Sequence, residues 1–267
     1  MTDAPARAFA ARTPAFFLIC IGTGLLAGLL SGLFGVGGGT VIVPLLVLFL
    51  KFDQRLAAGT SLAAIVPTAT IGVISYAVHG SVAWVPAIIL AAGAVVGAQI
   101  GTWLLPRISQ TALRWGFVAF VVVVIVSLFF VIPSRDSQIE LTVWAGIALL
   151  VVGVFTGVLA GLIGVGGGVI VVPVLVLLFG ASDLEAKGTS LLFMIPTAVS
   201  GTIGNLRRKN VDLVAAACGG VAACTTTALG AWLATLLSPA VANILFAAFL
   251  VFIGTQMAIK AIRGRKR

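Results

Sequence analysis

The chain has 267 residues, of which 61% are hydrophobic and 9% are charged, and its mean hydropathy is +1.24. This composition excludes a water-soluble domain of ordinary make-up and is typical of a polytopic membrane protein. The formal net charge is +9, but the basic residues stand in short groups between apolar runs. Loop charge that orients membrane segments explains this pattern more simply than nucleic-acid binding. We therefore predict the lipid bilayer, and no nucleic acid, as a partner.

The chain is predicted to be an all-α membrane protein built from ten apolar segments. A polar tail, 1–13, precedes segments at about 14–34, 40–50, 56–78, 82–105 and 113–132. A signal peptide is an alternative for the first segment, but the run is too long for one. After a polar linker, 133–140, come segments at about 141–163, 169–179, 188–206, 211–237 and 241–262, and then a basic tail, 263–267. A membrane crossing takes about 20 residues. Eight of the segments are long enough, and the second segment of each set of five is too short.

The two sets of five segments form an internal repeat at a constant offset of 129 residues. Without gaps, residues 28–72 and 157–201 are identical at 23 of 45 positions. The identical positions include a GVGGG motif and a GTSL run in each copy. We infer two homologous membrane repeats, 14–132 and 141–262.

The distribution of basic residues predicts how the repeats are oriented. If all ten segments cross and the N-terminus is cytoplasmic, 14 of the 16 Lys and Arg residues lie inside. If the two short segments are re-entrant, 11 Lys and Arg residues lie inside and 5 lie outside. The positive-inside rule favours the first arrangement, in which both termini are cytoplasmic and five crossings per half invert the second repeat. Inverted repeats are common in alternating-access transporters.

The GVGGG motifs predict broken helices inside the membrane. Glycine weakens a helix by about 1 kcal/mol relative to alanine, and backbone amides freed in hydrocarbon need a partner. In transporters that partner is often the substrate, although small residues also let helices pack closely. The candidate substrate-binding glycines are Gly35, Gly37, Gly38, Gly39, Gly164, Gly166, Gly167 and Gly168.

Hydroxyl side chains follow each motif at helical spacing. They are Thr60, Ser61 and Thr68 in the first repeat and Thr189, Ser190 and Thr197 in the second. Hydroxyls and free amides are neutral donors, and a sulfur or phosphorus oxyanion offers several acceptors to them. We predict a small anionic substrate bound by these groups, with helix packing as the alternative role.

Few titratable residues are placed for catalysis or proton transfer. The seven carboxylates fall in tails, loops or segment ends, so no acidic relay is predicted. His79 is read as an interfacial histidine rather than a titrating gate. Arg55 and Lys187 precede the GTSL runs and either attract an anion or are ordinary loop charges. No metal-ligand spacing, phosphate-binding Gly-Lys-Ser/Thr or catalytic motif is present, so we predict no metal, no cofactor and no enzymatic activity.

The duplicated pattern GLxGVGGGxxxVP, followed each time by GTSL, resembles the sulfite exporter TauE/SafE family of bacterial membrane permeases. The resemblance covers about 17–262. It implies an inner-membrane permease for sulfite, sulfonates or related organosulfur anions, and by motif match it points to the same eight glycines. Family members are usually described with seven or eight spans, so the prediction of ten segments departs from the family.

The function predicted is a secondary transporter that works by alternating access around a site between the two glycine motifs. A passive anion channel is the nearer alternative. A membrane enzyme acting on a lipid-linked phosphate would need a buried acid, histidine or arginine near the motif. The sequence leaves open the anion, the direction of transport, the coupling ion and the oligomeric state, a homo-oligomer included.

Overall fold

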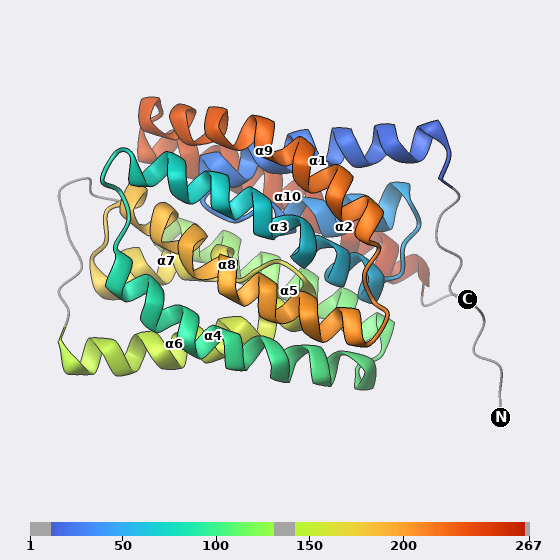
Figure 1. The fold of residues 1–267 in the computed structure, drawn as a ribbon, viewed down its shortest axis with the longest axis horizontal. Coiled ribbons are helices and arrows are strands. Elements are labelled where there is room, and N and C mark those ends of the chain that lie inside the picture. Colours follow the sequence, from blue (N-terminus) through green and yellow to red (C-terminus); the bar gives the residue numbers. More distant parts are fainter. Residues whose placement is uncertain (1–11, 131–141, 265–267) are drawn as a thin grey trace.

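The structure, a computed structural model, describes residues 12–130 and 142–264 (Figure 1). The predicted linker, 133–140, and most of both predicted tails lie outside these residues. The helices are α1 (Pro14–Phe34), α2 (Gly39–Phe49), α3 (Gln54–Ala77), α4 (Trp84–Leu104), the 3₁₀ turn η1 (Leu105–Arg107), α5 (Gln110–Phe130), α6 (Val143–Ile163), α7 (Gly168–Phe179), α8 (Asp183–Arg207), α9 (Leu213–Leu236) and α10 (Pro239–Gly264). They follow the ten predicted segments, so the prediction of an all-helical fold is confirmed over the described residues.

The largest difference from the predicted bounds is at α8. This helix begins five residues before the predicted segment, at Asp183 rather than at Gly188. Ser182 is its N-cap and accepts a hydrogen bond from the Glu185 N–H at 3.2 Å. Two acidic residues stand in the first turn, where the helix dipole favours negative charge. The prediction of a loop here was wrong because a capped, charged first turn carries no apolar signal.

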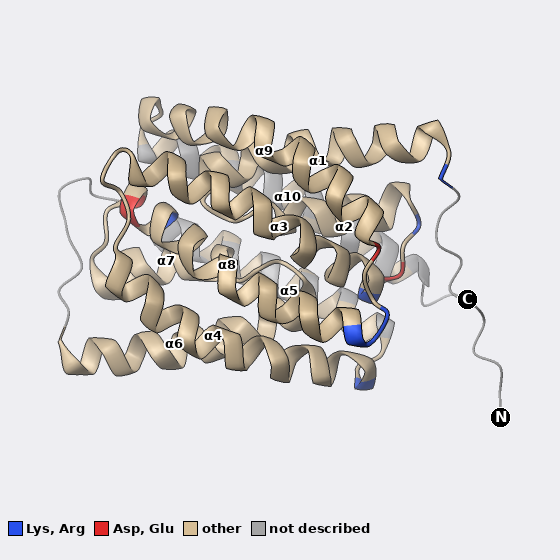
Figure 2. Cartoon of the chain, viewed as in Figure 1, with Lys and Arg blue, Asp and Glu red and all other residues tan. Residues whose placement is uncertain are grey.

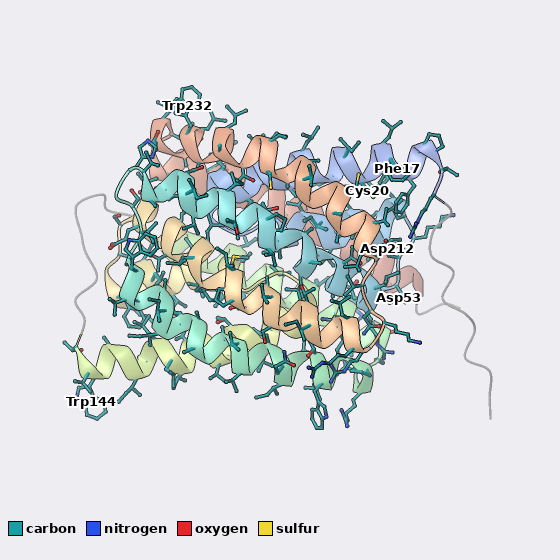
Figure 3. All side chains as sticks on the ribbon, in the orientation of Figure 1. Phe17, Cys20, Asp53, Trp144, Asp212 and Trp232 are labelled. Atoms are coloured by element: carbon teal, nitrogen blue, oxygen red, sulfur yellow. The ribbon has the colours of Figure 1, made fainter. Side chains whose placement is uncertain are left out.

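Five helices of the described part are long and apolar enough to cross a membrane, which makes the chain a multi-pass membrane protein. They are α1, α3, α4 with η1, α6 and α9. The short α2 and α7 have 11 and 12 residues. Trp144 and Trp232 project outward near one end of the helices in Figure 3, and Asp53 and Asp212 lie at the other end. Exposed tryptophans near helix ends are typical of membrane-interface anchors.

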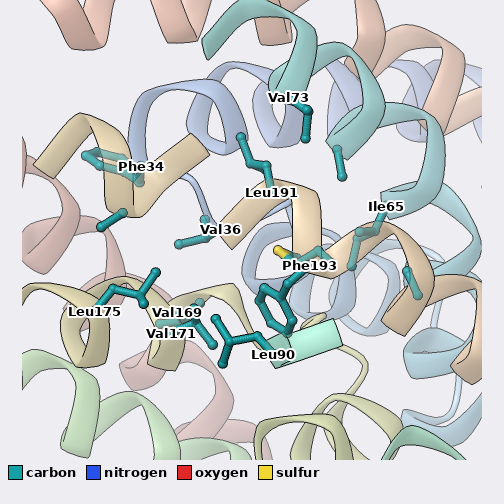
Figure 4. Packing of buried hydrophobic residues seen from close by; sticks show 14 of the residues in the cluster. Phe34, Val36, Ile65, Val73, Leu90, Val169, Val171, Leu175, Leu191 and Phe193 are labelled. Atoms are coloured by element: carbon teal, nitrogen blue, oxygen red, sulfur yellow. The ribbon is translucent and has the colours of Figure 1, made fainter. Parts of the chain in front are cut away.

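The helices pack in a pattern that is unchanged when the two repeats are exchanged. Helix α1 packs along α9, and its equivalent α6 packs along α4. Small residues permit both contacts, since a Cβ on Gly28 would overlap the α9 backbone and one on Gly157 would overlap the α4 backbone. Between these pairs, α3 and α8 contact each other and carry the GTSL runs. Apolar side chains, including Val36, Ile65 and Phe193, fill the centre (Figure 4).

Candidate functional site at the paired helix breaks

The first GVGGG motif connects α1 to α2 through left-handed backbone. Helix α1 ends at Phe34, and Gly35 has φ of 70° while its N–H donates to the Ser31 carbonyl at 2.8 Å. Gly37 and Gly38 follow with φ of 69° and 78°, and α2 begins at the next residue. Glycine is the residue that adopts this region without steric cost, so the motif fixes where the helix stops.

The second motif repeats this geometry between α6 and α7. Gly164 has φ of 80°, and its N–H donates to the Ala160 carbonyl at 2.8 Å. Gly166 and Gly167 have φ of 81° and 85°, and α7 begins at Gly168. The chain is buried throughout both connections.

The two connections contact each other, although 129 positions separate them in sequence. A Cβ built on Gly39 would lie 2.7 Å from the Val165 Cα, and one on Gly168 would lie 2.9 Å from the Gly35 carbonyl oxygen. Ser190 of α8 donates to that same carbonyl oxygen at 2.9 Å. Residues from both repeats therefore form one buried site, which we call the break site and define as residues 35–40 and 164–169.

Two apolar side chains lie against the break site from equivalent positions of α3 and α8. The Met194 methyl group contacts the faces of both Gly37 and Gly166, so that a Cβ on either glycine would overlap it. Ile65, the residue equivalent to Met194, would lie 3.3 Å from a Cβ on Gly37 and 3.1 Å from one on Gly166. The repeats thus place one α3 residue and one α8 residue between the two motifs.

The break site contains backbone N–H groups that bond to none of the described residues. Among the hydrogen bonds made by the described residues, none uses the amide N–H of residues 36–40 or of residues 165–169. Where a right-handed residue is followed by a left-handed one, successive N–H groups turn toward a common side, a geometry that binds anions. Buried amides are normally paired, so an unpaired set indicates a place for an acceptor.

Most of the predicted hydroxyls bond to protein groups that are not part of the break site. Thr60 Oγ1 accepts from the Asp212 N–H at 3.0 Å, and Thr189 Oγ1 accepts from the Ala83 N–H at 2.9 Å. These contacts are equivalent in the two repeats and hold the N-termini of α9 and α4. In addition, Thr68 Oγ1 donates to the Ala64 carbonyl at 2.8 Å, and Thr197 Oγ1 donates to the Phe193 carbonyl at 2.7 Å, both within their own helices.

The two predicted serines differ from the threonines and from each other. Ser190 Oγ contacts the break site through the Gly35 carbonyl. Ser61, its equivalent in α3, is fully buried, and its Oγ makes no hydrogen bond to the described residues. A buried hydroxyl of this kind is a candidate for binding something other than the protein.

The predicted gating residues lie in three separate places. Arg55 Nη2 donates to the carbonyls of Pro106 and Ile108 at 3.0 and 2.8 Å, so it ties α3 to the turn after α4. His79 is exposed just after α3, with its ring Nδ1 2.8 Å from the Ser75 carbonyl oxygen. Lys187, by contrast, is buried in α8, where its Nζ lies 3.2 Å from Asp183 Oδ2.

Sequence reasoning missed Met194, which lies against the break site, and Tyr76, which lies against the last turn of α1. The Tyr76 hydroxyl donates to the Gly32 carbonyl at 2.7 Å and joins α3 to the last turn of α1. Met194 was overlooked because an apolar residue in an apolar helix gives no signal. The only available clue to Tyr76 was that it is the one tyrosine in the chain.

A multi-pass helical fold in which two interrupted helices meet at buried glycines is the architecture of a membrane transporter. Residues 3–128 and 149–267 match the family described as Sulfite exporter TauE/SafE, and the chain belongs to this family. It is 28% identical over 222 residues to the probable membrane transporter protein YunE of Bacillus subtilis, covering 73% of this chain and 80% of that one.

Other relatives agree with this class. A probable membrane transporter protein of Xylella fastidiosa is 29% identical over 224 residues, covering 83% of this chain and 86% of that protein. A probable membrane transporter protein of Haemophilus influenzae is 30% identical over 193 residues, covering 70% of this chain and 72% of that protein. No solved structure matches the chain. The chain is therefore a membrane transporter of the TauE/SafE family.

Proposed function

We propose that the protein is an inner-membrane permease that carries a small sulfur oxyanion, such as sulfite or an organosulfonate, by alternating access around the break site. The observation that carries this proposal is the set of ten buried amide N–H groups, 36–40 and 165–169, for which the described residues provide no acceptor. We choose a sulfur oxyanion as the substrate because the family is described as sulfite exporters.

The chemistry of the break site suits an oxyanion. Helices α2 and α7 both begin there, so the positive ends of two helix dipoles lie at the same place. A tetrahedral or pyramidal oxyanion has several acceptor oxygens, which can accept from both motifs at once. A hydrogen bond to a charged group contributes about 1.5 to 3 kcal/mol, so two or three amides account for micromolar to millimolar binding.

The proposal includes inverted repeats with both termini in the cytoplasm. In support, α1 begins at one end of the molecule and its equivalent α6 begins at the opposite end (Figure 1). Most Lys and Arg residues drawn in Figure 2 gather at the end where α1 begins. Because cytoplasmic loops collect basic residues, this charge distribution favours a cytoplasmic location for that end.

The contacts of Met194 favour a carrier over a passive channel. A channel needs a continuous path, whereas the Met194 methyl group lies between Gly37 and Gly166 and covers both motifs. Methionine is unbranched and changes rotamer at little cost, so its side chain can move aside when an anion enters. In this mechanism α3 and α8 move relative to the break site and open it to one side at a time.

The test is transport by the purified full-length protein in liposomes. Uptake of labelled sulfite, sulfate and methanesulfonate is measured with and without a pH gradient, and protein-free liposomes give the background. The proposal predicts saturable uptake of at least one of the sulfur oxyanions. Uptake at background for all three would overturn it, and a flux that never saturates would favour the channel.

A further inference from the structure

We propose that the Lys187 ammonium group binds the anion at the break site. Asp183 is paired with this ammonium group until the anion replaces Asp183. This inference rests on the proposed function. It assigns a binding role to one charged side chain, and it makes the exchange of partners at Lys187 part of substrate entry.

The first support for this proposal is that Lys187 packs against the first motif. A Cβ built on Gly35 would lie 2.6 Å from the Lys187 Cα, 2.7 Å from its Cβ and 2.9 Å from its Cγ. The lysine stem therefore packs directly on the residue at which α1 ends. Ser190, one turn further along α8, donates to the carbonyl of the same Gly35. Lys187 is thus the charged residue that α8 brings beside the break site.

The burial of the ion pair carries the second step. Lys187 and Asp183 are each 5% exposed, and their charged atoms are 3.2 Å apart. Removing two charges from water is costly, and a buried pair is often no more stabilising than apolar residues of similar size. Such a pair in a membrane helix indicates a functional demand for charge more than a demand of the fold.

The comparison between repeats carries the third step. Ala58 packs on Gly164 as Lys187 packs on Gly35, since a Cβ on Gly164 would lie 2.6 Å from the Ala58 Cβ. Gln54 stands at the position equivalent to Asp183. The first repeat therefore makes the same helix-to-motif contact with neutral residues. The same backbone arrangement forms without charges in the first repeat, so the fold alone does not explain the Lys187–Asp183 pair.

The location of the remaining cations carries the fourth step. The other Lys and Arg residues drawn in Figure 2 gather at the far end of the molecule, away from the start of α8. The amides and hydroxyls of the break site are neutral. A buried monoanion is strongly favoured by an adjacent opposite charge, and among the described Lys and Arg residues it is Lys187 whose stem contacts a glycine of the break site. Because Asp183 competes for the same ammonium group, anion binding and release of Asp183 are coupled.

The experiment measures the Kd for labelled sulfite and the KM of its uptake, using full-length variants in liposomes. Lys187→Gln should raise both constants at least about tenfold, which is the loss expected for a charged hydrogen bond. Lys187→Arg should retain most of the affinity. Asp183→Asn should lower Kd, because it removes the competing carboxylate. Lys51→Gln is the matched control, an exposed lysine in a loop, and should leave both constants unchanged.

The neutral double variant Asp183→Asn/Lys187→Gln separates binding from folding. The proposal predicts that it folds, as judged by membrane yield and thermal unfolding, but binds sulfite as weakly as Lys187→Gln. A wild-type Kd in the double variant would overturn the inference and make the pair a structural one. Failure of the double variant to fold would also overturn it. The proposed function fails by a different result, the absence of oxyanion uptake by the unaltered protein.

Discussion

The two glycine motifs have the same backbone and different neighbours. Gly35, Gly37 and Gly38 adopt the same left-handed conformations as Gly164, Gly166 and Gly167. Beside the first motif lie the buried Lys187–Asp183 pair and Ser190, which donates to the Gly35 carbonyl, whereas the neutral Ala58 packs on the second motif. The left-handed backbone therefore occurs in both motifs, whereas a buried ion pair lies beside the first motif alone among the described residues.

A second comparison concerns hydroxyls that are alike in both repeats. Thr60 accepts from the N-cap residue of α9 and Thr189 accepts from that of α4, at nearly the same distance. The repetition of this cap contact gives the GTSL runs a structural reason to occur twice. Some features shared by the repeats build the fold, such as these caps. Others, such as the break amides, leave groups without an acceptor among the described residues.

The largest effect should come from a side chain placed on either motif. Gly37→Val and Gly166→Val should each reduce transport to background, because a branched residue disfavours positive φ and its Cβ would overlap the Met194 methyl group. Uptake into liposomes measures this. Gly180→Val is the control, since Gly180 has φ of 66° and open space around it. Normal uptake by both motif variants, made in normal amounts, would show that the glycines serve packing alone or are dispensable.

The inverted arrangement predicts an all-or-none labelling pattern. In a background without native cysteines, cysteine at position 138 should react with an impermeant thiol reagent added from the periplasm, and cysteine at position 110 should not. Position 138 lies in the linker outside the described residues, and Gln110 begins α5. The reverse pattern would mean that the repeats are not inverted as proposed.

The cap threonines should have effects on both binding and stability. Each of these hydroxyl oxygens accepts from a cap N–H and keeps its own hydrogen to donate to an anion, so Thr60→Val and Thr189→Val should each weaken sulfite binding about tenfold, and the double variant should lose binding nearly completely. Because each substitution also leaves a cap N–H without its acceptor, we expect a stability loss of about 1 to 3 kcal/mol per site. Binding titrations and thermal unfolding separate the two effects, and Thr→Ser variants are the controls. An unchanged affinity in a folded double variant would move the substrate away from these hydroxyls.

The paired serines should give the smallest and most informative difference. Ser190→Ala removes a hydrogen bond to Gly35 and should reduce stability by about 1 kcal/mol. Ser61→Ala removes a buried hydroxyl that has no described partner, so stability should be unchanged or slightly increased while sulfite affinity falls. Thermal unfolding with and without sulfite measures both. Equal destabilisation by the two substitutions would show that Ser61 has a structural partner.

Much of the fold could be predicted because apolar runs, glycine breaks and the repeat are all visible along the chain. The start of α8 could not, since Ser182 and Asp183 replace apolar signal with a cap. In the site, the positions of the helix breaks follow from glycine chemistry. The hydrogen-bond partner of Thr60 could not be predicted, because it lies 152 residues away and is brought to Thr60 by packing between the repeats. The Asp183–Lys187 pair was not predicted, because the expected segment began only at Gly188. An i,i+4 spacing also occurs in surface pairs, and only the burial of these two residues distinguishes this one.

Equilibrium binding of labelled sulfite to the purified protein tests the central claim most directly. The account predicts saturable binding of one anion per chain, abolished in the double variant Gly37→Val/Gly166→Val and retained in Gly180→Val. Thermal unfolding establishes that the variants are folded. Binding by the double variant with the Kd and stoichiometry of the unaltered protein would contradict the account, because the anion would then bind somewhere other than between the two motifs.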